Sequence, residues 1–300
     1  MATTSTALTV TRAGARPRLR SGALAQSARV FARDRQAMVG LLIIAIVGGA
    51  ALAAPLISPW DPLTSASVER LSPLGTPGHV LGTDEQGRDI LSRLIWGGRA
   101  SLLVGILPTV TAGVVALGLG LLAGYLGGAV DHVIMRALDV FFAFPLVLLA
   151  IAIVGVIGPG MGNQMFALAV VLVPYSTRVV RTATLSVKPL EFVEAARALG
   201  ASDGRLVGRH LLPNVLPPLL VYTSTLVGMM IVASAGLSFL GLGVQPPTPD
   251  WGVMVGNGRL VLYRAAHVAT IPGVVIVVAA LAFNFVGDGL REALDPRARR

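Results

Sequence analysis

The chain has 300 residues, of which 54% are hydrophobic and only 13% are charged, and its mean hydropathy is +0.76. So few polar groups cannot cover the surface of a soluble fold, which makes lipid the expected solvent and excludes disordered, collagen-like and coiled-coil proteins. The sequence contains no cysteine, which excludes disulfides, zinc–thiolate and iron–sulfur sites and a cysteine nucleophile, while its net charge of +9 comes from arginine.

The N-terminal region, residues 1–37, is a basic tail whose first 30 residues are predicted to be disordered. Residues 38–57 then contain no ionisable group and predict a first membrane-spanning helix, since about 20 helical residues cross a hydrocarbon core of about 30 Å. A cleaved signal peptide is the alternative, because Ala51-Leu52-Ala53 fits a cleavage site. The 37 preceding residues are too many for a signal peptide, so the sequence favours a membrane anchor.

The segment from residue 58 to 99 is the longest polar stretch between predicted spans. Asp84 to Asp89 could be read as a calcium loop, but Gly87-Arg88 interrupts the required alternation of oxygen ligands. The sequence instead predicts a turn with a capping aspartate before a short helix at the membrane interface.

Five further spans follow in a core of residues 100–287. The charge-free stretch 140–177 is too long for one crossing, and Gly158 to Asn163 is a strong turn signal that divides it. The predicted fold is therefore an all-α membrane protein with six transmembrane helices. These cover approximately residues 38–57, 100–126, 134–157, 164–183, 214–238 and 267–287.

Arginine bias predicts the orientation of these helices. With both termini on one side, that side carries 18 Lys or Arg residues and the other side carries six. Because basic loops remain in the cytoplasm, both termini, including the basic C-terminal residues 288–300, are predicted to be cytoplasmic.

The energy source is constrained by what the chain lacks. The spans contain no carboxylate except Asp139, near the start of the third span, and Arg136 one turn earlier can pair with it, so a proton relay is disfavoured. A phosphate-binding loop needs Gly-Lys-Ser/Thr, whereas the single lysine, Lys188, lies between Val187 and Pro189. If ATP drives this protein, another subunit must hydrolyse it.

The predicted cytoplasmic loop 184–213 contains an amphipathic helix. Pro189 suits its first turn, and Glu191 and Glu194 lie where the helix dipole favours negative charge. Gly200 is the expected end of this helix. The residues predicted to share one face are Phe192, Ala195, Ala196 and Leu199.

A second helix is predicted to begin at a Ser202-Asp203 cap, to run through Leu212 and to end at Pro213. One alternative is a solvated loop without a partner, although its apolar face argues against this. Another is a DNA-binding helix-turn-helix, but about 30 residues between two spans cannot supply the three helices of such a domain.

This loop resembles the EAA loop of ABC importer permeases. The resemblance rests on Glu194-Ala195-Ala196, Gly200, and His210 followed by Leu212-Pro213. His210 departs from the isoleucine of the general pattern and resembles the dipeptide/oligopeptide/nickel branch. Two further stretches, 81–102 and 237–252, are similar to the C-type permeases of that branch, and the match covers about residues 30–296.

The resemblance implies a type I importer permease, not an enzyme, that forms half of a translocation path in the bacterial inner membrane. Its implied partners are a homologous B-type permease, two cytoplasmic ATPase subunits that hold ATP and magnesium, an extracytoplasmic solute-binding protein and lipid, with no nucleic acid. The chain itself is expected to hold no cofactor. The implied ATPase-coupling residues are Glu191, Phe192, Glu194, Ala195, Ala196, Leu199, Gly200 and Ala201, supported by His210, Leu212 and Pro213.

On the opposite side, which the predicted topology places outside the cytoplasm, Asp84, Arg88, Asp89 and Trp251 are candidate contacts for the binding protein. A purely structural plug is an equal alternative for the first three. Trp251 follows a proline-rich turn and is expected to be an anchor at the membrane interface.

The implied function is an ATP-driven importer of the peptide class. Dipeptides, longer peptides, nickel chelates and glycosides all remain open as substrates. The alternatives are a stand-alone secondary carrier or channel, and a membrane-tethered DNA-binding regulator.

Overall fold

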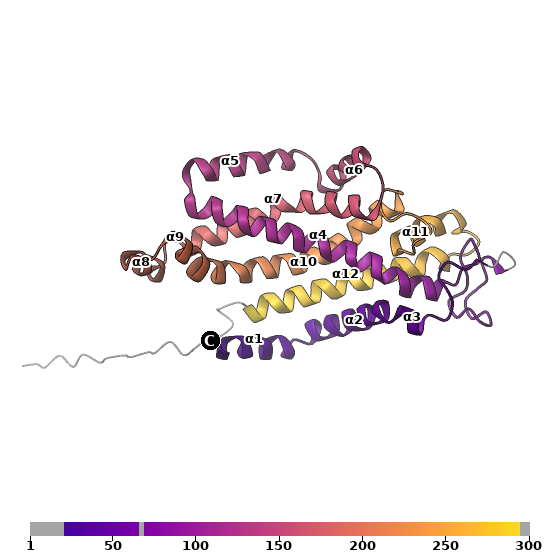
Figure 1. The fold of residues 1–300 in the computed structure, drawn as a ribbon. Helices are drawn as coiled ribbons and strands as arrows, with labels where there is room; N and C mark the ends of the chain where they lie inside the picture. The colour runs from indigo at the N-terminus through magenta and orange to yellow at the C-terminus, as the bar shows by residue number, and fades with distance from the viewer. Residues whose placement is uncertain (1–20, 66–68, 295–300) are drawn as a thin grey trace, which may run out of the picture.

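A computed structural model describes residues 21–65 and 69–294, and these residues form long helices with no named strand. The helices lie lengthwise in an elongated bundle (Figure 1). The short helices α8 and α9 mark one end of the bundle, and the segment between α3 and α4 marks the other.

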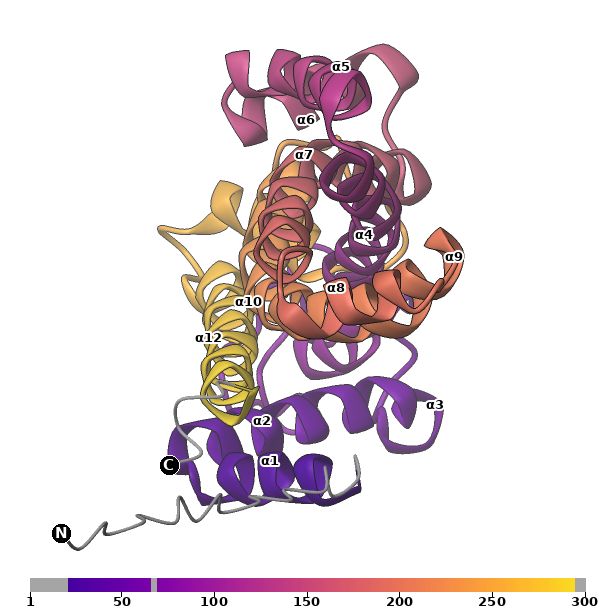
Figure 2. The ribbon, with the colours of Figure 1, turned by 90° about the vertical axis from the view of Figure 1, so that its left-hand side faces the viewer.

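The N-terminal helices lie along one edge of the bundle (Figure 2). They are α1 (Ser21–Arg33), α2 (Arg35–Leu52) and α3 (Ala54–Ile57). The prediction of disorder is wrong for residues 21–30, which belong to α1; residues 1–20 lie outside the described residues. Helix α1 packs against the last helix, where a Cβ on Gly289 would lie 3.3 Å from the ring of Phe31. This tertiary contact stabilises a segment whose composition resembles that of a disordered tail.

Helix α4 (Ile90–Leu126) has 37 residues and begins ten residues before the predicted span. The side chain of Asp89 caps it by accepting a hydrogen bond from the amide of Ser92 at 2.7 Å. Among residues 70–89 no separate helix precedes α4, and the helix that follows the capping aspartate is the first part of α4, so the prediction of a short separate helix is wrong.

The predicted third span is broken. Helix α5 (Gly128–Asp139) and the 3₁₀ turn η2 (Val140–Ala143) are followed by α6 (Leu146–Ile157), which is bent by 90° from them. Pro145 lacks an amide hydrogen, and it holds Phe144 in an extended conformation, φ −117° and ψ 140°. A continuous helix over residues 134–157 is therefore wrong, and the broken pair lies at the edge opposite α1 and α2 (Figure 2).

The remaining helices complete the bundle. They are α7 (Met161–Val187), α8 (Glu191–Ala198), α9 (Asp203–Arg205), the π-helical turns η3 (Leu206–Leu211), α10 (Leu212–Phe239), α11 (Trp251–Gly258), η4 (Arg259–Val261) and α12 (His267–Leu294). The parallel pair α4 and α7 packs closely, because Gly120 and Gly124 let Val180 and Thr184 approach the α4 backbone.

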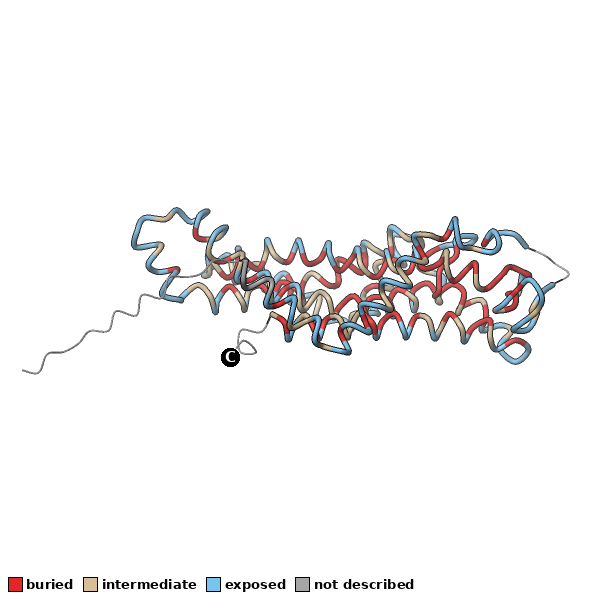
Figure 3. Tube along the Cα trace, turned by 90° about the horizontal axis from the view of Figure 1, so that it is seen from below, coloured by how far each residue is buried: buried red, intermediate tan, exposed pale blue. Residues whose placement is uncertain are grey.

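Within the described residues, five helical runs are long and apolar enough to cross a membrane, and the bent α5–α6 pair is a sixth if it forms one span. The five runs are Arg35–Leu52, Ile90–Leu126, Met161–Val187, Asp203–Phe239 and His267–Leu294. Buried residues follow the centre of the bundle, whereas much of its outer surface is exposed and apolar (Figure 3). This arrangement suits helices that meet lipid on the outside.

Candidate functional site

Helix α8 is attached to the bundle by one apolar side chain. Val193 is fully buried in a cluster that joins the ends of α4, α7 and α10. The cluster consists of Leu121, Val180, Val193, Leu206, Leu211, Val215 and Leu219. A single buried residue is enough to orient an eight-residue helix while leaving most of its surface uncovered.

The uncovered surface is the face that the sequence predicts for docking. Phe192 is 44% exposed and Leu199 is 87% exposed, and Ala195 is also exposed. Ala196 differs from them, because it is half-buried against the cluster around Val193. In addition, Glu191 and Glu194 lie exposed in the first turn.

The turn after α8 has the conformation expected from its glycine. Gly200 has a φ of +82°, which glycine adopts without the steric cost of a side chain. Its amide donates to the carbonyl of Arg197 at 3.0 Å, and the amide of Ala201 donates to Ala196 at 3.1 Å. These bonds close the helix and return the chain to the bundle, where Ala201 packs against the buried cluster.

Three side-chain contacts stabilise the base of this loop. The ring of His210 lies 6.1 Å from that of Phe192, centroid to centroid. The hydroxyl of Tyr125 on α4 donates to Asp203 at 2.5 Å, and the ammonium group of Lys188 donates to the Tyr125 carbonyl at 2.7 Å. Leu212 packs against the buried cluster and His210 lies beside Phe192, so both residues lie where the loop meets the bundle.

Pro213 does not end a helix, contrary to the prediction. The helical run continues from Asp203 through η3 into α10 without a break, and Pro213 lies in the first turn of α10. The wider π-helical turns before it shift the hydrogen-bond register, so the missing proline donor is tolerated. Because the second helix merges with a membrane span, the loop contains no separate three-helix domain.

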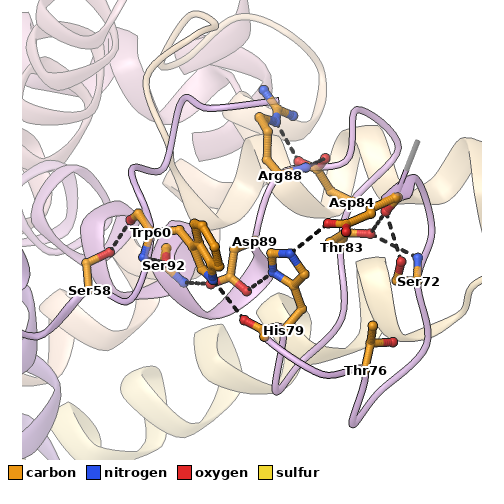
Figure 4. Close-up of polar contacts among 12 residues, drawn as sticks. Ser58, Trp60, Ser72, Thr76, His79, Thr83, Asp84, Arg88, Asp89 and Ser92 are labelled. Atoms are coloured by element: carbon orange, nitrogen blue, oxygen red, sulfur yellow. Dashed lines mark hydrogen bonds and ion pairs between the residues drawn. The ribbon is translucent and has the colours of Figure 1, made fainter. Parts of the chain in front are cut away.

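At the opposite end, the α3–α4 loop (residues 58–89) is organised around a buried carboxylate. Asp84 accepts hydrogen bonds from the Arg88 side chain at 2.6 Å and from the Arg88 amide at 2.9 Å (Figure 4). Arg93 of α4 lies 3.4 Å from the same carboxylate and donates to the Pro62 carbonyl at 3.1 Å. The buried charges are therefore paired, as their burial requires.

A second part of this loop surrounds His79. The two ring nitrogens of His79 lie 2.9 Å from Asp89 and 3.1 Å from Glu69, and its ring lies 5.3 Å from that of Trp60 (Figure 4). The hydrogen bond to Asp89 is the main cause that raises the pKa of His79, opposed by burial. His79 thus ties the loop to the carboxylate that caps α4.

The N-terminal end of α11 is also buried. Trp251 is only 1% exposed, and its indole nitrogen donates to the Leu94 carbonyl at 2.9 Å. Asp250 caps α11 through the amide of Val253 at 3.1 Å and accepts from the Ser101 hydroxyl at 2.7 Å. Burial raises the pKa of Asp250 above its ordinary value.

The proposed role of Asp84, Arg88, Asp89 and Trp251 as surface contacts is contradicted by their burial, each being at most 4% exposed. The same burial contradicts the interpretation of Trp251 as an interfacial anchor and favours the structural alternative for the α3–α4 loop. Sequence reasoning missed the side chains that this loop does expose. The large apolar ones are Trp60, Leu63, Leu74 and Val80, and their only signal is that apolar residues occur within a polar segment rich in glycine and proline.

Two ion pairs join α5 to α7. Arg181 and Asp131 form two bonds of 2.5 Å, and Arg178 donates to Asp139 at 2.6 Å. The predicted pairing of Asp139 with Arg136 is wrong, because the fold brings Arg178 to Asp139 instead. No group of three or more potential metal-binding side chains occurs among residues 21–65 and 69–294.

Comparison with known proteins decides the family. Residues 116–300 match the family described as binding-protein-dependent transport system inner membrane component. The chain belongs to this family. Residues 23–73 of the permease also match the N-terminal transmembrane domain of oligopeptide transport permease C.

Curated relatives match the permease over most of its length. It is 42% identical over 271 residues to a glutathione transport system permease of Pectobacterium atrosepticum, which covers 90% of each chain. It is also 42% identical over 274 residues to a di/tripeptide transport system permease of Pseudomonas aeruginosa, again with 90% of each covered.

A solved structure shares the fold. The inward-facing MetNI methionine ABC transporter aligns with 69% of the permease and 98% of its own chain, at a TM-score of 0.56 and 22% identity. The permease is thus a multi-pass subunit of an ABC importer in the bacterial inner membrane. Such a subunit works with a partner permease, an ATPase and a binding protein.

Proposed function

We propose that the permease forms half of the path of an ATP-driven importer of short peptides, and that a separate ATPase drives it through residues 191–200. The peptide class is supported by the names of its relatives, which transport dipeptides, di/tripeptides and glutathione. The observation that carries the coupling role is the exposed face of α8. Phe192, Ala195 and Leu199 remain uncovered on a helix that is anchored to three spans by Val193.

This arrangement suits mechanical coupling. A helix that carries small side chains on one face can lie in the groove of another subunit. Because Val193 packs with residues of α4, α7 and α10, displacement of α8 acts on three spans at once. The spans can then move as largely rigid bodies between inward- and outward-facing arrangements.

The proposed assembly follows from the single chain. One set of six spans is too small to enclose a peptide-sized path, so a homologous B-type permease supplies the other half. Two ATPase subunits hold ATP and magnesium and bind one coupling loop each. A binding protein delivers solute at the α3–α4 loop, and the arginine bias supports a cytoplasmic location of the α8 end.

Site-specific cross-linking tests the coupling role. The chain has no cysteine, so Ala195→Cys introduces a single thiol on the exposed face of α8. In the assembled transporter, a short bifunctional maleimide reagent should join this thiol to the ATPase. Glu292→Cys, exposed near the end of α12, is the control and should not react with the ATPase to a similar extent.

Measurements of uptake and ATP hydrolysis provide the second test of the coupling role. Glu194→Lys reverses a charge at the start of α8, and Gly200→Pro demands a φ near −65° where the chain has +82°. Both variants should insert into the membrane but lose uptake and solute-stimulated ATP hydrolysis. Normal transport by a well-expressed double variant contradicts the coupling role, and transport by the permease alone in liposomes contradicts the whole assembly.

A further inference from the structure

A cluster of charged and aromatic side chains lies where the α5–α6 span is broken. We name it the Arg178 cluster; it consists of Asp139, Phe142, Tyr175, Arg178 and Tyr222, contributed by α5, η2, α7 and α10. The guanidinium group of Arg178 lies 3.7 Å from the centroid of the Phe142 ring, and that ring lies 4.7 Å from the ring of Tyr175. Arg178 also donates to Asp139 at 2.6 Å.

The cluster lies within helices that are long and apolar enough to span a membrane, in the half of α7 that leads to α8. Val180, two residues after Arg178, packs at Gly120 of α4, and α4 continues without a charged residue to Leu126. Tyr175 lies next to the middle of the 27-residue helix α7. A charged pair at this depth is costly against hydrocarbon, so such groups normally face a polar path or a protein interior.

The two ion pairs between α5 and α7 differ in exposure. The side chains of Arg181 and Asp131 are 30% and 19% exposed and form two bonds, which suits a structural attachment. Those of Arg178 and Asp139 are 49% and 44% exposed and form one bond. The second pair therefore has unused hydrogen-bonding capacity that a solute can reach.

The tyrosines add polar groups without partners. Tyr222 of α10 packs against the core cluster to which Val171 and Leu172 of α7 belong. Neither hydroxyl has a hydrogen-bond partner among the described residues, and both side chains are half-buried. A tyrosine hydroxyl in an apolar environment normally finds a partner, so these two are available to water or to a polar solute.

We propose that the Arg178 cluster is a solute-contact site for short peptides with free charged ends, an inference that rests on the proposed peptide transport. The peptide carboxylate binds Arg178 and its ammonium group binds Asp139, so each charge exchanges one partner for another and no charge is left unpaired. The Phe142 and Tyr175 rings contact the peptide side chains, and the two phenol hydroxyls bind its amide groups.

This exchange explains why such a site is compatible with transport. The peptide must displace an existing ion pair, which keeps its affinity low, and a path needs sites that are weak enough for the solute to leave. The broken span agrees with this role, since transporter sites commonly lie near the midplane at discontinuous helices. Helix α6 begins without a side-chain cap, so its first amide groups add positive potential at the break.

Photo-cross-linking in the assembled transporter tests direct contact. Phe142→p-benzoylphenylalanine places a reactive group in the cluster, and tritiated trialanine is the probe. The control is Val133→p-benzoylphenylalanine, at a position on α5 that is 68% exposed. Labelling at position 142 should exceed labelling at 133 by about tenfold and should fall with unlabelled trialanine in excess.

Import of trialanine by the complete transporter distinguishes a solute-binding role of the Arg178–Asp139 pair from a purely structural role. Arg178→Gln and Asp139→Asn should each lower import by about tenfold, and the exchange Arg178→Asp with Asp139→Arg should not restore it, because the peptide would have to bind in reverse. The matched exchange Arg181→Asp with Asp131→Arg should restore import lost in Arg181→Gln, as expected of a structural pair. The amount of assembled complex is measured for every variant.

These experiments distinguish failure of the proposed peptide transport from failure of the proposed solute-contact site. If the wild-type transporter imports no trialanine, the proposed peptide function is wrong, and this inference is wrong with it. If the wild type imports trialanine but full import returns on exchange of Arg178 and Asp139, the pair is structural and the inference alone is overturned. Equal labelling at positions 142 and 133 overturns it in the same way.

Discussion

At Gly200, backbone conformation rather than packing determines which residues are tolerated. A Cβ added there would have no neighbour within 4 Å, but the φ of +82° strains any residue with a side chain. We therefore expect Gly200→Ala to disfavour the turn by about 1–2 kcal/mol and to lower solute-stimulated ATP hydrolysis. Gly204, which also has open space and no positive φ, is the matched control.

The measurement is ATP hydrolysis by the assembled transporter with and without solute. Gly204→Ala should be close to wild type, whereas Gly200→Ala should be impaired at equal amounts of complex. If the two alanine variants behave alike, the conformation at Gly200 is not what couples α8 to the ATPase.

His79 predicts a pH dependence for the α3–α4 loop. Because its pKa is raised in the folded loop, the protonated ring stabilises the fold. This stabilisation is complete below the unfolded pKa of about 6.5, and it is lost as the pH rises through the higher folded value. The opening equilibrium should then increase by up to about tenfold per pH unit within that window.

Tryptic cleavage at the exposed Arg70 reports this opening. Cleavage of the wild-type loop, measured relative to His79→Gln at each pH, should increase as the pH rises. A constant ratio between the two proteins would show that His79 does not control the loop.

For single residues, the sequence predicts features that depend on local backbone conformation and misses features that depend on contacts with distant residues. Gly200 was predictable because its role depends on local backbone conformation, as was the cap at Asp89. The burial of Trp251 was not, because it depends on Leu94 and Ser101, about 150 residues away in the sequence. The partner of Asp139 was missed for the same reason, since Arg178 lies 39 residues away.

Among the helices, the N-terminal end of α4 was not predicted, because the spans were identified as charge-free stretches and the first ten residues of α4 include two arginines. Arg93 and Arg99 lie inside α4, and their side chains donate to carbonyl groups of other segments, Arg93 to that of Pro62 and Arg99 to those of Ala51 and Leu52. The break at Pro145 was missed for a different reason. A proline in a membrane helix is compatible with either a mild kink or a complete break, and packing rather than sequence decides between them.

The contact between α4 and α7 provides a prediction at the level of helices. A Cβ on Gly120 would lie 2.5 Å from that of Val180, whereas a Cβ on Gly118 would have no neighbour within 4 Å. Gly120→Ala should therefore lower stability by about 1–3 kcal/mol by forcing the two helices apart. Gly118→Ala should be neutral or should gain up to about 1 kcal/mol from helix propensity.

Thermal unfolding of the purified complex in detergent measures this difference. The midpoint should decrease for Gly120→Ala and should not decrease for Gly118→Ala. Equal midpoints for the two variants would contradict the close approach of α4 and α7.

For the whole molecule, the two ends of the bundle carry different chemistry. The α8 end exposes a small apolar face with two carboxylates and is surrounded by arginine and lysine. The opposite end carries the α3–α4 loop, in which Asp84, Arg88 and Asp89 are paired and buried. This asymmetry agrees with the proposed assembly, in which an ATPase binds at the α8 end and solute arrives at the other.

For the orientation of the bundle in the membrane, we expect the α8 end to face the cytoplasm and the α3–α4 loop to face outward. Ala195→Cys on α8 and Leu74→Cys on the α3–α4 loop introduce single exposed thiols at opposite ends. A membrane-impermeant maleimide added to spheroplasts should label position 74 and leave position 195 unlabelled, and inverted vesicles should give the reverse result. The reason is the excess of basic residues on the α8 side, which the membrane retains in the cytoplasm. Labelling of position 195 from outside would contradict the proposed orientation and the docking of an ATPase on α8, because ATP is hydrolysed in the cytoplasm.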